Sequence, residues 1–537
     1  MTSMKRITWG WYLPAGAMAL WVCLPLLVVL VSWHSPQTEV WRHLLATGLG
    51  HLLSNTLLLM LGVGLVVGVL GVSLAWLTAA CDFPGRRLFD WALLLPLALP
   101  TYVVAFVAMG LMSYSGPVLS LWRDVFGPQA WYPDIRQAGG VVLVMGSVLY
   151  PYVYMLARAA FLQQGKTLVD AARTLGHTPW VGFFRVALPI ARPAVFTGIA
   201  LALMETLADF GAVAVFNFDT FTTAIYKAWF GFGNLPAATQ LASLLLLWVA
   251  LVLGLEQYQQ SHKRSGHAAH HRPQRFVLRG KWRWLAFAYC SLVLGLCFVV
   301  PVSQLVLWVV KTGLSGLDAR FLQLIKHSFI LAGLTALAVS MLAVMASFGE
   351  RFAKRTSLQY LTRFTTLGYA LPGSVLAVGV MMSFTLVDRY VLWPLFGWGD
   401  EVQPLLLGSV LALILAYTVR FFAVGLGPVQ QGLARVRPQL QEAAQTLGQP
   451  LPVILRRIYW PLLRPGLLTG LVLVLVDVMK EMPATLLLRP FGWDTLAVRV
   501  YEMTSEGEWQ KAALPALCLV LVSIVPVVLA IRRSQRG

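Results

Sequence analysis

Four acidic residues lie inside long apolar stretches of this sequence, where a charge is unusual. They form two pairs, Glu205 with Asp209 and Asp477 with Glu481. A spacing of four predicts that both carboxylates of a pair lie on one face of a helix. An acid at the bilayer centre costs about 2.5–3.5 kcal/mol, so we expect these acids to face protein or water. A ring of four carboxylates would suit a polyvalent cation and makes them candidates for a translocation path. Alternatively, the acids pair with Lys480 or with backbone groups and only fix helix packing.

The second acid pair follows the first by 272 residues, and the same offset relates a longer polar stretch. Residues 170–193 and 442–465 align without a gap and are identical at ten of 24 positions. An internal repeat near half the chain length predicts two copies of one structural unit that face each other.

Each copy of the polar stretch reads as a short capped helix, a bend and a second short helix. The acid that opens each copy lies in the positive end of the first helix, and a glycine ends that helix. The residues that we assign to these loops are Asp170, Ala171, Ala172, Gly176 and Pro189 in the first copy and Glu442, Ala443, Ala444, Gly448 and Pro461 in the second.

This pattern resembles the EAA loop of ATP-binding cassette (ABC) importer permeases, which runs Glu-Ala-Ala, three residues, Gly, nine residues, Ile, one residue, Leu-Pro. The second copy departs from it at Trp460, which replaces Leu. The first copy has Asp170 in place of Glu and Val186 in place of Ile. The resemblance implies that the loops 163–193 and 435–465 each dock on one of two copies of a separate cytoplasmic ATPase.

Composition places the chain in a membrane. Of its 537 residues, 58% are hydrophobic and only 12% are charged, whereas soluble domains contain about 25% charged residues. We therefore predict an all-α, polytopic membrane protein with two repeated six-helix halves, 1–257 and 283–537, joined by a basic cytoplasmic linker at 258–282. A spanning helix needs about 20 apolar residues. We predict twelve such segments, near 11–33, 56–80, 91–113, 139–161, 195–216, 238–257, 284–310, 328–349, 364–385, 404–426, 466–488 and 513–531.

The distribution of positive charge predicts the topology. With the N-terminus inside, the inner connections and termini hold 29 of the 41 Lys and Arg residues, if Arg158 and Arg420 are counted as inner helix ends. Positive residues favour the cytoplasmic side. Both repeated loops and both termini are then cytoplasmic. The net charge of +19 reflects this topology rather than a nucleic-acid surface.

Two further features lie outside the repeated loops. Leu97-Ala-Leu-Pro100 and Tyr369-Ala-Leu-Pro372 repeat at the same offset, and we expect both prolines to kink spanning helices. The segment 257–282 is polar, basic and aperiodic, which predicts a flexible linker. We interpret its four histidines as part of that linker rather than as a metal site.

The acid-bearing stretches also resemble the fused ferric-iron permeases among these importers. In the first half the similarity lies in Glu205–Gly211 and Thr220–Trp229, and in the second in Lys480–Pro490 and Asp494–Tyr501. The resemblance implies a bacterial inner-membrane protein that receives iron from a separate periplasmic binding protein. Nothing in the residues themselves fixes iron, so thiamine, phosphate, sulfate and polyamine substrates stay open, and we assign no metal ligands.

No catalytic signature is present in the sequence. Gly165-Lys166-Thr167 resembles the end of a phosphate-binding loop, but Ala160 stands where that motif requires Gly. We expect no cofactor in this chain, with ATP and Mg²⁺ bound and ATP hydrolysed by the partner. The alternative function is a proton-driven secondary transporter that uses the four acids as a relay. That reading leaves the paired loops unexplained.

Overall fold

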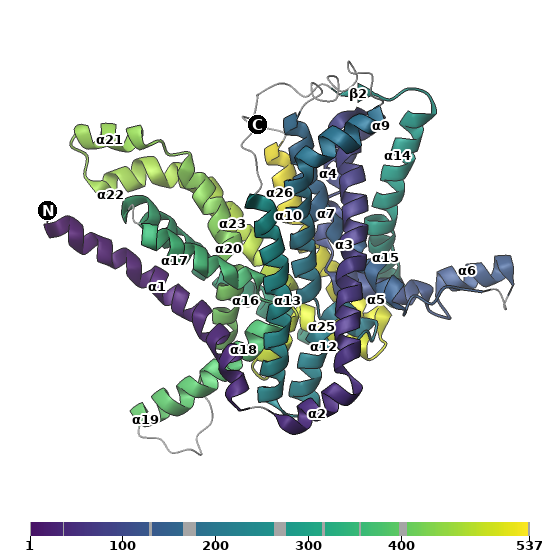
Figure 1. The fold of residues 1–537 in the computed structure, drawn as a ribbon, viewed down its shortest axis with the longest axis horizontal. Coiled ribbons are helices and arrows are strands. Elements are labelled where there is room, and N and C mark those ends of the chain that lie inside the picture. Colours follow the sequence, from purple (N-terminus) through teal and green to yellow (C-terminus); the bar gives the residue numbers. More distant parts are fainter. Residues whose placement is uncertain are drawn as a thin grey trace. The chain divides into compact units, whose positions relative to one another are not determined.

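The computed structural model describes residues 2–35, 37–127, 131–164, 179–261, 275–313, 317–353, 356–396 and 405–534. This part of the chain is almost entirely helical (Figure 1). Asp170, Ala171, Ala172, Gly176 and the linker histidines lie outside the described residues.

The first sequence half contains thirteen described elements apart from short helical turns. They are α1 (Thr2–Val31), α2 (Thr38–Thr47), α3 (Leu49–Ala80), β1 (Cys81–Asp82), α4 (Arg86–Ala92), α5 (Thr101–Met112), α6 (Pro117–Phe126), α7 (Ala138–Gln164), α9 (Pro179–Gly182), α10 (Leu188–Ala208), α11 (Gly211–Val215), α12 (Phe221–Tyr226) and α13 (Leu235–Ser261). The turns are the 3₁₀ segments η1 (Ser32–His34) and η2 (Leu95–Ala98) and the π segments η3 (Phe183–Ala187) and η4 (Lys227–Gly231).

The second half follows the same order of long helices. Its elements are β2 (Phe276–Val277), α14 (Lys281–Leu294), α15 (Val300–Thr312), α16 (Ala319–Ala353), α17 (Thr356–Thr366), α18 (Gly373–Val387), α19 (Trp393–Phe396), α20 (Val410–Ala434), α21 (Pro438–Thr446), α22 (Leu451–Ile454), α23 (Trp460–Lys480), α24 (Pro483–Leu488), α25 (Leu496–Ser505) and α26 (Trp509–Ser534). The turns are η5 (Gly295–Val299), η6 (Leu367–Ala370), η7 (Asp388–Leu392) and η8 (Leu455–Tyr459).

Eleven helices in the described part of the chain are long and apolar enough to cross a membrane. Each overlaps one of the predicted spans, although several begin and end about ten residues away from the predicted bounds. The twelfth predicted span, 513–531, falls in α26, whose apolar portion Trp509–Val525 is shorter. The predicted fold class, an all-α polytopic membrane protein, is confirmed.

The helices form two compact units that differ from the sequence halves. One unit contains residues 1–38, 225–243 and 316–499, and the other contains residues 39–224, 244–315 and 500–537. Helix α1 therefore packs with α16, α17 and α18, and Trp21 meets Phe384 edge to face at 5.6 Å. Conversely, α15 packs with α5 and α26, where Phe106 stacks on Trp308. The division of the sequence into two halves at residues 257 and 283 therefore stays a prediction.

Small residues let long helices approach closely within each unit. A Cβ added at Gly71 of α3 would lie 2.5 Å from the Cβ of Val153 in α7. A Cβ at Gly466 of α23 would lie 2.4 Å from the carbonyl oxygen of Pro428 in α20. Lipid offers no hydrophobic driving force between helices. Close van der Waals packing at such glycines therefore stabilises the helix contacts inside each unit.

The repeated prolines break helices instead of kinking them, so that prediction was wrong. Pro100 and Pro372 both have extended backbones, with ψ near 140°, and lie just before α5 and α18. Each follows a 3₁₀ turn, η2 or η6. A proline disfavours helical geometry in the preceding residue. Leu99 and Leu371 accordingly are extended, with ψ of 123° and 125°.

The described ends of the predicted linker are ordered elements. Helix α13 continues to Ser261, and β2 pairs in parallel with β1, with Cys81 opposite Phe276. The Leu278 amide also donates to the Asp82 carbonyl at 3.1 Å. The chain after the linker is thereby attached to the end of α3.

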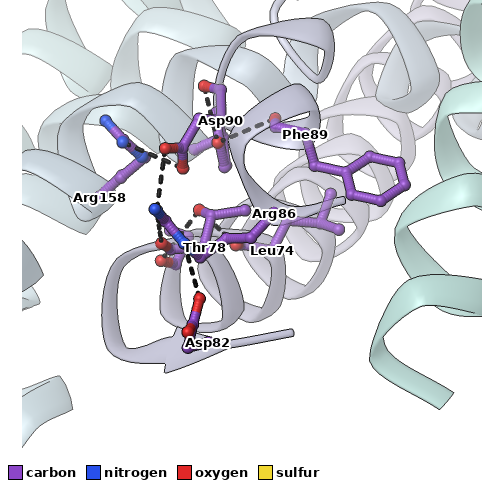
Figure 2. Close-up of polar contacts among 9 residues, drawn as sticks. Leu74, Thr78, Asp82, Arg86, Phe89, Asp90 and Arg158 are labelled. Atoms are coloured by element: carbon purple, nitrogen blue, oxygen red, sulfur yellow. Dashed lines mark hydrogen bonds and ion pairs between the residues drawn. The ribbon is translucent and has the colours of Figure 1, made fainter. Parts of the chain in front are cut away.

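An ion network lies beside this strand pair (Figure 2). The Arg86 guanidinium lies between Asp82 and Asp90, at 3.4 and 2.9 Å, and Arg158 contacts Asp90 at 3.1 Å. Burial, and next the Arg86 charge, lower the pKa of Arg275, which precedes β2. Charges placed together in a partly buried site must be compensated. This network therefore holds α4 and α7 beside the strand pair.

Replacement of Gly466 by Ala should destabilise the protein, because the added methyl group meets a backbone carbonyl that cannot move aside. We expect a loss of about 1–3 kcal/mol. The measurement is the thermal midpoint of the detergent-solubilised protein. Gly427→Ala is the matched control, since a Cβ at Gly427 has no neighbour within 4 Å. Equal midpoints for the two variants would contradict the close-packing argument.

Candidate functional site

The second copy of the repeated loop is described completely. Helix α21 begins at Pro438, after the extended residue Arg437, because proline suits a first helical position. It ends at Thr446, and Gly448 follows with a φ of 72°. In this left-handed conformation the Gly448 amide donates to Gln445 and the Gln449 amide to Ala444, at 2.9 and 3.0 Å. These bonds satisfy carbonyls at the helix end and turn the chain toward α22.

Helix α21 has one face on the protein and one face exposed. Ala444 packs against a buried apolar cluster that includes Ala346, Leu433 and Tyr459. Glu442 and Ala443 are exposed. Leu440 in the first turn of α21 and Leu447 directly after its last residue are 46% and 78% exposed. Apolar side chains exposed together on a short helix are typical of a protein contact surface.

Both copies re-enter the bundle through the same element. The π turns η3 and η8 occupy equivalent positions, 272 residues apart, and lead directly into α10 and α23. Pro189 and Pro461 are exposed in the first turns of these helices. The repeat seen in the sequence is therefore also a repeat of backbone structure at this point.

The intramembrane acids do not share a helical face within each pair, so this prediction was wrong. Helix α10 ends at Ala208 and α23 at Lys480, and the next residues, Asp209 and Glu481, have extended backbones with ψ of 129° and 111°. The spacing rule fails because the helix stops between the members of each pair. Pro483 has no amide hydrogen to continue the helix and opens α24 instead.

Asp209 caps the short helix α11. Its Oδ1 accepts from the Ala212 amide at 2.8 Å, and its Oδ2 accepts from the Thr101 hydroxyl. Its own carbonyl accepts from the Thr222 hydroxyl at 2.7 Å. A carboxylate that accepts two or more hydrogen bonds at a helix N-terminus is stabilised by those donors and by the helix dipole.

Glu481 caps α24 in the equivalent way but has a different counter-group. Its Oε1 accepts from the Ala484 amide at 3.2 Å, and its Oε2 lies 3.1 Å from Nε of Arg420. The two residues are 6% and 8% exposed. Arg420 also donates to the Leu371 carbonyl at 3.0 Å. The Glu481 carboxylate is thus neutralised inside its own unit.

Gly373 makes this ion pair sterically possible. It is the repeat equivalent of Thr101, and a Cβ there would lie 2.5 Å from Glu481 Oε1 and 2.9 Å from Arg420 Nη1. One half therefore combines a threonine with a short acid, and the other half combines a glycine with a longer acid and an arginine. The sequence analysis missed Thr101 and Gly373, although both follow the repeated Leu-Pro.

Arg420 was assigned wrongly to an inner helix end. It lies in the middle of α20 and is buried, so it does not belong in the count of cytoplasmic positive charges. An isolated arginine in an apolar helix was the signal that could have identified it as the partner of a buried acid.

Glu205 and Asp477 lie one turn before the helix breaks and are half-buried. Asp477 Oδ1 is 4.0 Å from Lys480 Nζ. These contacts fit the alternative in which the acids pair locally. A ring of all four carboxylates stays a prediction, as does the role of each acid in a pathway.

Comparisons with known proteins agree with this geometry. Two stretches, 68–264 and 339–536, match the family "Binding-protein-dependent transport system inner membrane component". Together they cover more than half of the chain and include both repeated loops. The chain belongs to this family, the inner-membrane permeases of ABC importers, and carries its domain twice.

The relatives include proteins of the same fused form. The Fe(3+)-transport system permease protein FbpB 2 of Haemophilus influenzae is 29% identical over 521 residues, 95% of each chain. The Ferric transport system permease protein FbpB of Actinobacillus pleuropneumoniae is 23% identical over 88% of this chain and 69% of its own. The Sulfate transport system permease protein CysT of Escherichia coli matches 47% of this chain at 29% identity, with 92% of its own length covered. The resemblance to fused ferric-iron permeases is confirmed.

Arg420→Met should strongly destabilise the protein, because it leaves the Glu481 carboxylate buried without its counter-charge. Breaking a buried pair from one side costs about 3–5 kcal/mol. Thermal unfolding in detergent measures this loss. The double variant Arg420→Met/Glu481→Gln should recover part of it, since the amide oxygen still accepts from Ala484.

The control for this experiment is the exposed pair Lys511 and Glu508, whose Nζ and Oε1 are 2.7 Å apart. Such pairs contribute about 0.2–1 kcal/mol, so Lys511→Met should change the unfolding midpoint little. A loss in Arg420→Met no larger than in this control would contradict the assigned pairing.

Proposed function

We propose that this permease carries ferric iron from the periplasm to the cytoplasm in an importer driven by ATP. The observation that carries the proposal is the full-length similarity, 95% of both chains, to a permease named for Fe(3+) transport. The sulfate relative matches only 47% of this chain. The binding-protein-dependent family supports a separate binding protein and an ATPase as partners.

Coupling would run through the exposed face of the repeated loops. Helix α21 would dock with Glu442, Ala443, Ala444 and Gly448 on one ATPase subunit, and the first copy, with Asp170, Ala171, Ala172 and Gly176, on a second. ATP and Mg²⁺ would be bound and ATP hydrolysed in those subunits. ATP can change the permease conformation only by favouring one arrangement of the loops over another.

The intramembrane acids have separate roles in this proposal. Glu205 and Asp477 are half-buried and are the better candidates for contact with a translocated cation. The hydrogen bonds and the ion pair of Asp209 and Glu481 favour a structural role in fixing the helix breaks. Both chain termini would be cytoplasmic, in line with the positive-inside count.

Cells lacking this gene should lose uptake of radioactive ferric iron and regain it when the gene is restored. In vesicles, uptake should require the purified permease, its ATPase, the binding protein and ATP together. Sulfate uptake serves as the comparison, because a sulfate permease is among the relatives. Restored sulfate uptake with unchanged iron uptake would overturn the assignment of ferric iron as the substrate. Uptake by the permease alone in a pH gradient would instead support the secondary transporter.

Gly448→Asp should weaken docking of the ATPase, because a non-glycine residue at positive φ costs about 1–2 kcal/mol and distorts the end of α21. We expect about tenfold less ATPase to copurify at limiting concentration. Gly507→Asp is a matched control. Gly507 is also exposed, has a φ of 78° and ends a helix, but lies in a connection predicted to be outside. Equal copurification by both variants would refute the docking role of Gly448.

A further inference from the structure

A buried tyrosine connects the second loop to the membrane helices. Tyr459, the last residue of η8, is fully buried, and its hydroxyl donates to the Gln441 side-chain oxygen at 2.6 Å. Gln441 lies in α21, immediately before Glu442. The aromatic ring also contacts Phe348 and Phe352 of α16, at centroid distances of 5.5 and 5.9 Å.

Arg351 completes this connection from the last turn of α16. Its guanidinium carbon lies 5.2 Å from the centre of the Tyr459 ring. Its Nη1 donates to the Leu433 carbonyl at 2.8 Å, and its Nη2 donates to the Val436 carbonyl. These carbonyls lie at the C-terminal end of α20, where a positive charge is favoured by the helix dipole. The ends of α16 and α20 and the starts of α21 and α23 therefore meet around Tyr459.

The three residues of this connection do not recur in the first half of the sequence. The positions 272 residues earlier are Ala79, Val169 and Ala187, none of which has a side-chain donor or acceptor. Ala79 and Ala187 are buried. An apolar aromatic contact occupies this region instead, with Trp76 packed on Phe161 and Phe183 at centroid distances of 5.3 and 4.8 Å.

We propose that Tyr459 is a positioning residue that ties α21 to the membrane helices through Arg351 and Gln441. The second loop then moves with α16, α20 and α23 as one body, because a buried hydrogen bond is costly to leave unmade. The inference rests on the proposed coupling to an ATPase for its functional consequence, but the tie itself is a property of this chain.

The tie is tested on the isolated permease with a spin label at Gln445Cys, an exposed site on α21, after the five native cysteines are replaced. Tyr459→Phe removes only the hydroxyl and should increase the mobility of the label. Gln441→Leu should have the same effect, and the double variant should be no more mobile than either single one. Tyr417→Phe is the matched control, since it deletes a buried hydroxyl bonded to Thr485 at 2.6 Å, away from α21. Unchanged label mobility in both Tyr459→Phe and Gln441→Leu would overturn the tie.

The functional arm uses the complete transporter in vesicles and measures ions imported per ATP hydrolysed. Tyr459→Phe should lower this ratio about fivefold, the lower end of usual coupling effects, while ATP hydrolysis continues. A merely structural loss would reduce the amount of active complex and leave the ratio unchanged, and this result would overturn the positioning role. Tyr360→Phe, at a tyrosine 65% exposed, should keep the wild-type ratio. If the wild-type chain failed to assemble with any ATPase, the proposed function would be refuted. The mobility of the spin label in the isolated permease would still test whether Tyr459 ties α21 to the membrane helices.

Discussion

A carboxylate that ends a helix inside an apolar bundle must find donors, and this requirement shapes the centre of both units. Asp209 and Glu481 stand where the long helices α10 and α23 stop. Each accepts the amide three residues ahead and so starts a new short helix. The helix break, the capping carboxylate and the new short helix therefore depend on one another. Without the carboxylate, the first amides of α11 and α24 would lose their partners in a region where water is scarce.

The two halves keep this backbone solution and differ in the side chains that complete it. The breaks at Pro100 and Pro372, the π turns η3 and η8 and the ends of α10 and α23 all recur after 272 residues. The partners do not recur, since the Thr101 hydroxyl serves one half and the Arg420 guanidinium the other. A duplicated unit can thus retain its geometry while its polar interactions become different. We therefore expect the two halves to be alike in backbone structure and different in polar chemistry.

Much of the fold could be predicted from the sequence, because bilayer thickness and apolar run length determine a spanning helix. The α21 helix and its glycine end also followed from local rules of capping. The helix breaks did not follow, since the predicted spans 195–216 and 466–488 run past Ala208 and Lys480. In the sequence, the carboxylates that end the helices look like ordinary members of a helical face. The contact of Tyr459 with Arg351 was not predicted, because the two residues lie in distant segments. The isolated Arg420 indicates a buried acid as its partner, but not which acid.

The assignment of helices to the two units has a consequence for biosynthesis. Helix α1 is synthesised before its packing partners α16 to α18, which begin at Ala319. At about 5–20 residues per second, the ribosome needs roughly 15–60 s to reach them. During that interval α1 sits in the bilayer with its contact surface covered only by lipid or by a chaperone. The nascent protein therefore cannot mature one half at a time, and its last steps of assembly wait until the second half has been inserted.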